Sequence, residues 1–281
     1  MNTSRTPYGL IIAALIVCVI VVAPLYMMVA ISLKADEQQI LTDFGSWRAF
    51  WVWPWEMSLV HYRFVLSDPT SPFLRFMFNT FVIVISIVVF GIIINSACAF
   101  ALSRLRFAGK GLILAILVAL IIIPMEALAI PLLLMMARIG WLETYQAQIV
   151  PFIAHPFSIF LFYQFFSKLP KDLDEAAFVE GATPFQVYWK IVLPLSLPVI
   201  ATVAILQSLE YWNAYLWPLM ITRGPATRPV SLALAQFFGT PPYLWGQLMA
   251  FSVMMSLPVL ILYLFFQRWF IQSVVNSAVK G

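Results

Sequence analysis

Three titratable side chains lie within or beside long apolar stretches of this 281-residue sequence. Glu126 follows a proline in "LIIIPMEALAI", His155 precedes one in "VPFIAHPF", and Glu210 comes directly after the uncharged residues 191–209. Because a charged group is costly in hydrocarbon, such residues usually face a polar interior and line the path of a solute or a proton. This set could serve an ion-coupled carrier, and His155 with either glutamate could also perform acid–base chemistry.

The densest group of polar and aromatic side chains lies in "LQSLEYWNAYLWPL", residues 206–219. A spacing of three places Glu210 and Asn213 on one helix face, with Gln207 and Trp217 roughly in line. This face predicts a stripe that lines a substrate pathway, although interface anchors and interhelical hydrogen bonds would use the same residues. The predicted pathway residues are Glu126, Gln207, Glu210, Tyr211, Asn213 and Trp217.

Two of the residues introduced above keep a second interpretation. Glu126 could lie at the outer water interface instead of in a cavity. His155 could be an interhelical hydrogen-bond partner instead of a proton relay.

Other chemistries lack the residues that they need. The two cysteines, Cys18 and Cys98, both fall in apolar runs and are interpreted as small apolar filler. No Cys/His spacing is typical of a metal site, and no nucleophile accompanies His155. The nucleotide-cradling pattern G-x-x-x-x-G-K-[ST] is absent. We therefore expect no catalytic residues, no metal and no cofactor bound by this chain.

The composition identifies the solvent of most of the chain as lipid. Hydrophobic residues make up 63% of it, charged residues only 10%, and the mean hydropathy is +0.94. Soluble domains average about 25% charged residues, so a water-soluble core cannot account for this excess. The net charge of +4 suits basic cytoplasmic loops and indicates no nucleic-acid partner.

Six apolar runs are long enough to span a bilayer, which takes about 20 residues. The predicted fold class is an all-α membrane protein with six transmembrane helices, the third broken by Pro124 and Pro131. Barrel strands would be shorter and would alternate in polarity. The first run is longer than the core of a signal peptide and is interpreted as an uncleaved span. The runs lie at residues 6–33, 76–103, 111–137, 144–167, 191–209 and from about 246 onward.

The orientation follows from basic residues in short loops. Arg104, Arg106 and Lys110 cluster after the second run, which places that loop, and with six spans both termini, in the cytoplasm. The expected organisation is a cytoplasmic N-terminus with the first span, a periplasmic loop, a core of spans two to six, and a cytoplasmic tail. These parts cover residues 1–33, 34–75, 76–270 and 271–281.

The expected periplasmic loop is rich in aromatic residues, and a second outer loop is expected at about 222–245. Tryptophan and tyrosine favour the membrane interface, so part of the first loop could lie on the outer membrane surface. It could also dock an external partner. The residues concerned are Trp47, Trp51, Trp53, Trp55 and Tyr62.

A charged stretch, "DEAAFVEGATPFQVYWKIVLP", interrupts the apolar sequence at residues 174–194, within the inner loop 168–194. Acids in the first turns favour a helix N-terminus, and Gly181 is a typical left-handed helix stop. Thr183, Pro184 and Gln186 then form a capping box that starts a second helix. Since anionic lipid would repel this acidic helix, we expect it to occupy a groove on a protein.

The same stretch follows the pattern E-A-A-x3-G-x9-I-x-L-P. It resembles the EAA motif of permease subunits in bacterial ABC importers, with Glu180 where the residue before the glycine is often aspartate. The broken third span, "GWLETYQAQIVPF", "YWNAYLWPL" and "NSAVKG" resemble the carbohydrate-type, maltose-permease family. The residues that carry the motif are Glu175, Ala176, Ala177, Gly181, Ile191, Leu193 and Pro194.

This resemblance implies a MetI-like permease in the bacterial inner membrane whose hairpin is a coupling helix. The hairpin would dock in a cleft of a cytoplasmic ATPase, with Glu175 beside a basic residue of that ATPase. The implied partners are an ATPase dimer that holds ATP and Mg²⁺, a second related permease subunit and an external solute-binding protein that delivers a sugar. The alternative is an ion-coupled secondary transporter that uses Glu126, His155 and Glu210.

Overall fold

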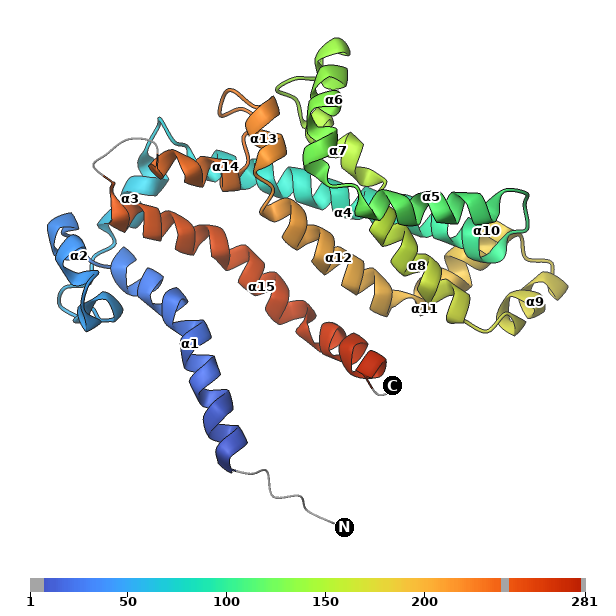
Figure 1. Ribbon diagram of the computed structural model, residues 1–281, viewed down its shortest axis with the longest axis horizontal. Coiled ribbons are helices and arrows are strands. Elements are labelled where there is room, and N and C mark those ends of the chain that lie inside the picture. Colours follow the sequence, from blue (N-terminus) through green and yellow to red (C-terminus); the bar gives the residue numbers. More distant parts are fainter. Residues whose placement is uncertain (1–7, 239–242, 279–281) are drawn as a thin grey trace. The chain divides into compact units, whose positions relative to one another are not determined.

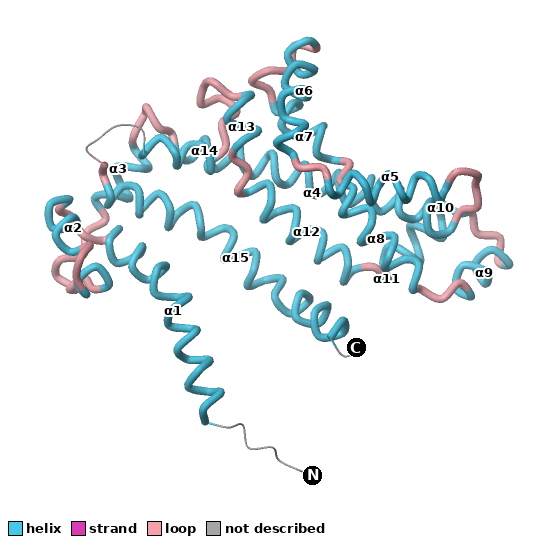
Figure 2. Tube along the Cα trace, in the orientation of Figure 1, coloured by secondary structure: helices cyan, strands magenta, loops and turns pink. Residues whose placement is uncertain are grey.

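A computed structural model describes residues 8–238 and 243–278 (Figure 1). The described chain consists of helices joined by loops, as Figure 2 shows, and its only extended pairing is an isolated bridge between Lys34 and Met57. The all-α prediction is confirmed. The chain divides into two compact units, which are described separately: unit 1 comprises residues 1–74 and 233–258, and unit 2 comprises residues 75–232 and 259–281.

All six apolar runs form helices. Four of them are long and apolar enough to cross a membrane without a sharp bend: α1, α4, α7 with α8, and α15. The other two runs form pairs bent by more than 40°, so the described residues hold four spans, or six if each bent pair counts as one. The four have the bounds α1 Tyr8–Ser32, α4 Phe73–Arg104, α7 Tyr145–Ile153 with α8 Pro156–Lys168, and α15 Trp245–Ala278.

The third run breaks at the first of its two prolines. Helices α5 (Lys110–Ile122) and α6 (Met125–Arg138) meet at 101°, so this run is not one straight rod. A residue before proline is pushed out of the helical region, and Ile123 is accordingly extended, with φ −73° and ψ 118°. Pro131 lies inside α6, which continues through it.

The fifth run starts later than predicted. Helix α12 spans Leu197–Trp212 and meets the preceding segment, residues 184–195, at 76°. Pro194 can donate no hydrogen bond to the carbonyl four residues back and crowds it. The chain therefore widens into a π-turn over Tyr188–Val192, where the Leu193 N–H donates to the Tyr188 carbonyl. The short helices here are α10 Pro184–Val187 and α11 Leu193–Leu195.

One apolar core in unit 2 joins α4, α8, α12 and the hairpin between α8 and α12. Phe100 of α4, Phe162 and Phe166 of α8 and Val203 of α12 are buried in it. Tyr188 of the hairpin packs against Phe100, with ring centroids 5.3 Å apart. The hairpin is therefore part of the folded unit and not a flexible connection between two spans.

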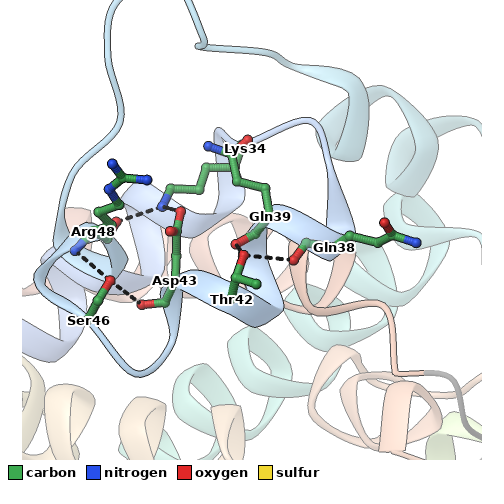
Figure 3. A network of polar contacts seen from close by, with 7 residues as sticks. All are labelled: Lys34, Gln38, Gln39, Thr42, Asp43, Ser46 and Arg48. Carbon is green, nitrogen blue, oxygen red and sulfur yellow. Dashed lines mark hydrogen bonds and ion pairs between the residues drawn. The ribbon is translucent and has the colours of Figure 1, made fainter.

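Most of the predicted periplasmic loop of residues 34–75 is a small helical structure in unit 1, and its last three residues begin α4. It contains α2 (Glu37–Asp43), the 3₁₀ turn η1 (Trp47–Phe50) and α3 (Val60–Ser67). The buried Lys34 Nζ lies 2.7 Å from Asp43 Oδ2 and donates to the Arg48 carbonyl at 2.6 Å, which ties these elements together (Figure 3). Trp51, Trp53 and Trp55 are exposed and pack ring against ring, so they remain free for either role expected of them.

The second expected outer loop and the tail are more helical than predicted. Residues 222–245 include α14 (Val230–Leu234) and η3 (Ala235–Phe238), while residues 239–242 lie outside the described residues. Residues 271–278 continue α15, and residues 279–281 lie outside the described part of the chain. The short helix α13 (Leu216–Ile221) follows α12 in unit 2.

Candidate functional site

Unit 2 contains a cavity of about 760 Å³. This volume is in the range of small-molecule binding sites, roughly 300–1,000 Å³. Most of its wall is apolar, and the ionisable side chains among its described lining residues are Glu126, His155, Glu210, Tyr211 and Tyr215. None of the described lining residues is lysine or arginine.

Three interruptions of helices border this one cavity. They are the break between α5 and α6, the break between α7 and α8, and the break between α12 and α13, and the lining residues Ile123, His155 and Tyr215 mark them. Backbone that is not helical is tolerated at membrane depth only where it is buried in protein or lines a polar cavity. Backbone N–H and C=O groups from three helix breaks therefore lie beside this cavity, and they add polar groups to a wall that is otherwise mostly apolar.

Asn95 of α4 satisfies the backbone at one of these breaks. Its Nδ2 donates to the Ile153 carbonyl at 3.1 Å, and its Oδ1 accepts from the His155 N–H at 3.0 Å. Asn95 is buried. One polar side chain of an apolar helix thus holds both ends of the α7–α8 break, which fixes the orientation of His155.

His155 and Glu210 form a pair at the cavity wall. His155 Nε2 lies 3.6 Å from Glu210 Oε2, and His155 Nδ1 is 2.9 Å from Ser158 Oγ within the first turn of α8. The Glu210 side chain is 53% exposed, which leaves its carboxylate accessible from the cavity. Such a pair offers acceptors and a donor to a polar ligand.

Aromatic rings form another part of the wall. Phe152 lies between Tyr211 and Trp217, with ring centroids 5.6 Å and 5.8 Å away. The Trp217 indole N–H donates to the Ala147 carbonyl at 3.0 Å. These rings are fixed by packing and hydrogen bonding, and they present apolar faces beside the carboxylates.

The structure divides the predicted pathway residues into two groups. Glu126, Glu210, Tyr211 and Trp217 line the cavity, whereas Gln207 and Asn213 are not among its lining residues. Helix α12 ends before Asn213, whose Nδ2 donates to the Leu209 carbonyl at 2.8 Å, so the predicted stripe does not continue along one helix. Trp217 consequently reaches the cavity from α13 and not from α12. The role of Asn213 in a pathway stays a prediction.

Gln207 has a different position. Its side chain is buried, and its Oε1 would lie only 3.0 Å from a Cβ atom added to Gly91 of α4. The structure thus places Gln207 in the helix contact between α4 and α12. The close approach of this contact explains the glycine.

Several lining residues were not singled out as pathway residues. They include Thr80 of α4 and Gln148 and Phe152 of α7, together with Tyr215. The prolines Pro151 and Pro156, which flank the α7–α8 break, were a sequence signal for the α7 residues. No sequence signal distinguishes Thr80 from other small polar residues.

The second candidate site is the hairpin between α8 and α12, and it has the predicted geometry of helix, turn and helix. Helix α9 (Asp172–Val179) ends in a Schellman arrangement, in which the Ala182 N–H donates to the Ala177 carbonyl and Gly181 has φ +85°. Thr183 and Gln186 form the predicted capping box at the start of α10. Gly181 has open space around it, so its backbone conformation and not crowding requires a glycine.

The motif residues point in two directions. Glu175, Ala176 and Gly181 are exposed, whereas Ala177 is buried in the core of unit 2. Ile191 and Leu193 also pack against that core. Ala176 and Ala177 therefore do not share one exposed surface, because Ala177 attaches α9 to the core of unit 2.

Comparison with known proteins identifies the family. Residues 87–276 match the family model described as binding-protein-dependent transport system inner membrane component, and the chain belongs to this family. It is a multi-pass inner-membrane protein with the fold of an ABC importer permease, and this membership favours an importer subunit over an ion-coupled secondary transporter.

Curated relatives extend over most of the chain. The trehalose/maltose transport system permease protein MalG of Thermococcus litoralis is 32% identical over 97% of this chain and 96% of that protein. The arabinooligosaccharides transport system permease protein AraQ of Halalkalibacterium halodurans is 36% identical over 72% of this chain and 73% of that protein. The sn-glycerol-3-phosphate transport system permease protein UgpE of Yersinia enterocolitica is 30% identical over 75% and 76%.

A solved structure has the same fold. It is a bacterial ABC transporter involved in the import of the acidic polysaccharide alginate, with a TM-score of 0.81 and 24% identity, covering 96% of this chain and 99% of that chain. The similarity in fold supports the helical architecture described above.

Replacing Asn95 with leucine should destabilise the α7–α8 break, because it leaves the Ile153 carbonyl and the His155 N–H without partners. Each buried group left unpaired costs about 1–3 kcal/mol. We expect a lower unfolding midpoint of the detergent-purified protein than for Asn213→Ala, whose hydrogen bond is exposed and local. Equal midpoints for the two variants would contradict the role assigned to Asn95.

Proposed function

We propose that this chain is one of two transmembrane subunits of an ATP-driven importer of neutral saccharides. The observation that carries the proposal is the hairpin: a complete EAA motif folded as a rigid, exposed elbow on the core of the permease. A lipid-facing helix would be basic, whereas α9 exposes the carboxylates of Asp172 and Glu175 in its first turn. Its surface therefore suits a basic groove on a protein.

The groove belongs to a cytoplasmic ATPase dimer that holds ATP and Mg²⁺, and this chain itself binds no nucleotide. Glu175 and its neighbour Ala176 are both exposed, so a carboxylate and a small side chain are available for docking. A second permease subunit supplies the other half of the pathway and the second hairpin. With the hairpin in the cytoplasm, both termini are cytoplasmic and the Trp-rich residues of unit 1 face the periplasm.

Transport proceeds by alternating access. Closure of the ATPase dimer on ATP moves the two hairpins, the cavities of the two subunits open outward, and an external solute-binding protein releases its sugar into them. Hydrolysis then resets the gate.

The cavity favours a neutral saccharide over an anionic one. Glu126 and Glu210 both line it, and among the described lining residues only His155 could oppose their charge. Aromatic faces beside carboxylates suit the C–H and O–H groups of a sugar, whereas a phosphate or uronate would be repelled. The relatives MalG and AraQ are named for trehalose, maltose and arabinooligosaccharides, whereas UgpE and the solved alginate transporter are named for anionic substrates. The neutral class therefore rests on the carboxylates of the cavity and not on the relatives.

Exchanging the charge at Glu175 tests the coupling assignment. Glu175→Lys should release the ATPase subunits from membranes that carry the assembled permease, because it places like charge against a basic groove. Glu180→Lys is the matched control, since it makes the same exchange on an exposed residue just outside α9. Unchanged co-purification of the ATPase with Glu175→Lys would refute the assignment.

The substrate class is tested with the reconstituted importer and a panel of neutral and acidic oligosaccharides. We expect uptake of a neutral sugar, and Glu210→Ala should reduce it by roughly tenfold or more, the loss of one hydrogen bond to a charged group. Glu143→Ala, whose exposed carboxylate pairs at 3.9 Å with Arg223, is the control. Preferential uptake of an acidic saccharide, or unchanged uptake by Glu210→Ala, would exclude the neutral-sugar cavity.

A further inference from the structure

Besides its chain connections and the buried Ala177, helix α9 has a further attachment to unit 2, an ion pair. Arg104, the last residue of α4, places its Nε 2.8 Å from Asp174 Oδ2, and its Nη2 donates to the Leu169 carbonyl at 3.1 Å. One guanidinium thus contacts both α9 and the segment that leads into it from α8. Figure 1 shows α9 at the same end of unit 2 as the loop that follows α4.

This pair is shielded from water although the motif surface beside it is exposed. The side chains of Arg104 and Asp174 are only 6% and 10% accessible. Arg104 Nε and Nη1 and Asp174 Oδ1 are buried and have no hydrogen-bond partner among the described residues, so the two side chains interact as an ion pair. Loss of either partner would therefore leave a buried charge uncompensated.

The Arg104–Asp174 ion pair is not explained by a contribution to the stability of the fold. Burial raises the pKa of the Asp174 carboxyl above its ordinary value, and the nearby Arg104 guanidinium, which lowers it, does not offset this effect. A carboxyl whose pKa is raised on folding favours the folded state below that pKa, and its ionisation weakens folding as the pH rises through it. Buried ion pairs of this kind can instead fix a specific geometry.

The covalent connections of the hairpin are bent. Towards α12 the chain passes through a π-turn and a 76° bend at Ser196, and towards α8 it passes through the extended Leu169. Helix α4, by contrast, is continuous over 32 residues and contains no proline. From Arg104 back to Thr80 at the cavity, the length of this helix is about 36 Å at 1.5 Å per residue.

We propose that Arg104 is a positioning residue that attaches the coupling helix α9 to α4, so that movement of α9 displaces α4 as a rod. Along α4 the movement reaches Asn95, which holds the α7–α8 break, and Thr80 and Ile83, which line the cavity. The link thus connects the ATPase-facing hairpin to the substrate-facing breaks. This inference rests on the proposed function and adds to it the residue that transmits the motion.

The test uses the reconstituted importer with its ATPase and binding protein. Arg104→Ala and Asp174→Asn should retain the ATPase in the complex and its basal hydrolysis, since neither residue forms the exposed docking surface. Stimulation of hydrolysis by sugar-loaded binding protein, and sugar transported per ATP, should fall at least about fivefold, the lower end of typical coupling between linked sites. Arg104→Lys should keep intermediate coupling, because lysine pairs with a carboxylate but lacks the forked guanidinium.

Arg106→Ala and Glu180→Gln are the matched controls, since both remove an exposed charge, one just after α4 and one just after α9. Normal stimulation in Arg104→Ala and Asp174→Asn would overturn the inference, as would loss of the ATPase from both variants. If Arg104→Ala does not assemble, Asp174→Asn and Arg104→Lys decide by the same readouts. Failure of the proposed function is a separate outcome, because the wild-type chain would then retain no ATPase at all.

Discussion

Backbone polar groups inside a bilayer can bond only to protein or to enclosed water, and the whole arrangement of unit 2 follows from this constraint. Three helix interruptions border the cavity of unit 2, and each leaves N–H and C=O groups outside the regular helical hydrogen-bond pattern. A further bend, at Ser196 between residues 184–195 and α12, lies away from the residues that line this cavity. Asn95 satisfies two of the freed groups, and the cavity can solvate others. The cavity thus serves both to satisfy backbone groups at the helix breaks and to provide a polar space between the helices.

The helices of unit 2 are of two kinds, broken and continuous, and each kind suits a different requirement of transport. Broken helices can change direction and so open or close a pathway, whereas a continuous helix transmits displacement over its full length. Helix α4 is continuous and contacts the hairpin at one end and the cavity at the other. The hairpin in turn is held by an apolar core and by a buried ion pair, while its motif carboxylate stays exposed. The account of coupling depends on this division between rigid and hinged elements.

The sequence predicted the helices, turns and caps better than the tertiary contacts between them. Hydropathy located all six apolar helices, and Pro124, Gly181 and the Thr183–Gln186 box predicted a break, a turn and a cap that are present because each acts on its own backbone. Asn213 does not extend the predicted face because α12 ends at Trp212. Gln207 lies within α12, but it faces Gly91 of α4 and not the cavity, and helical periodicity alone does not show which neighbour a face meets. The Arg104–Asp174 contact joins residues seventy positions apart and depends on packing, which no local pattern encodes.

Cross-linking at Ala176 tests the central claim most directly, because this residue is exposed in the middle of the coupling motif. The chain has only two cysteines, so replacing Cys18 and Cys98 with serine leaves Ala176→Cys as a unique probe. The account predicts that this thiol cross-links to the ATPase subunit in membranes, with a yield that changes when ATP binds. Labelling of the same thiol by a membrane-impermeant reagent from the periplasmic side would contradict the account.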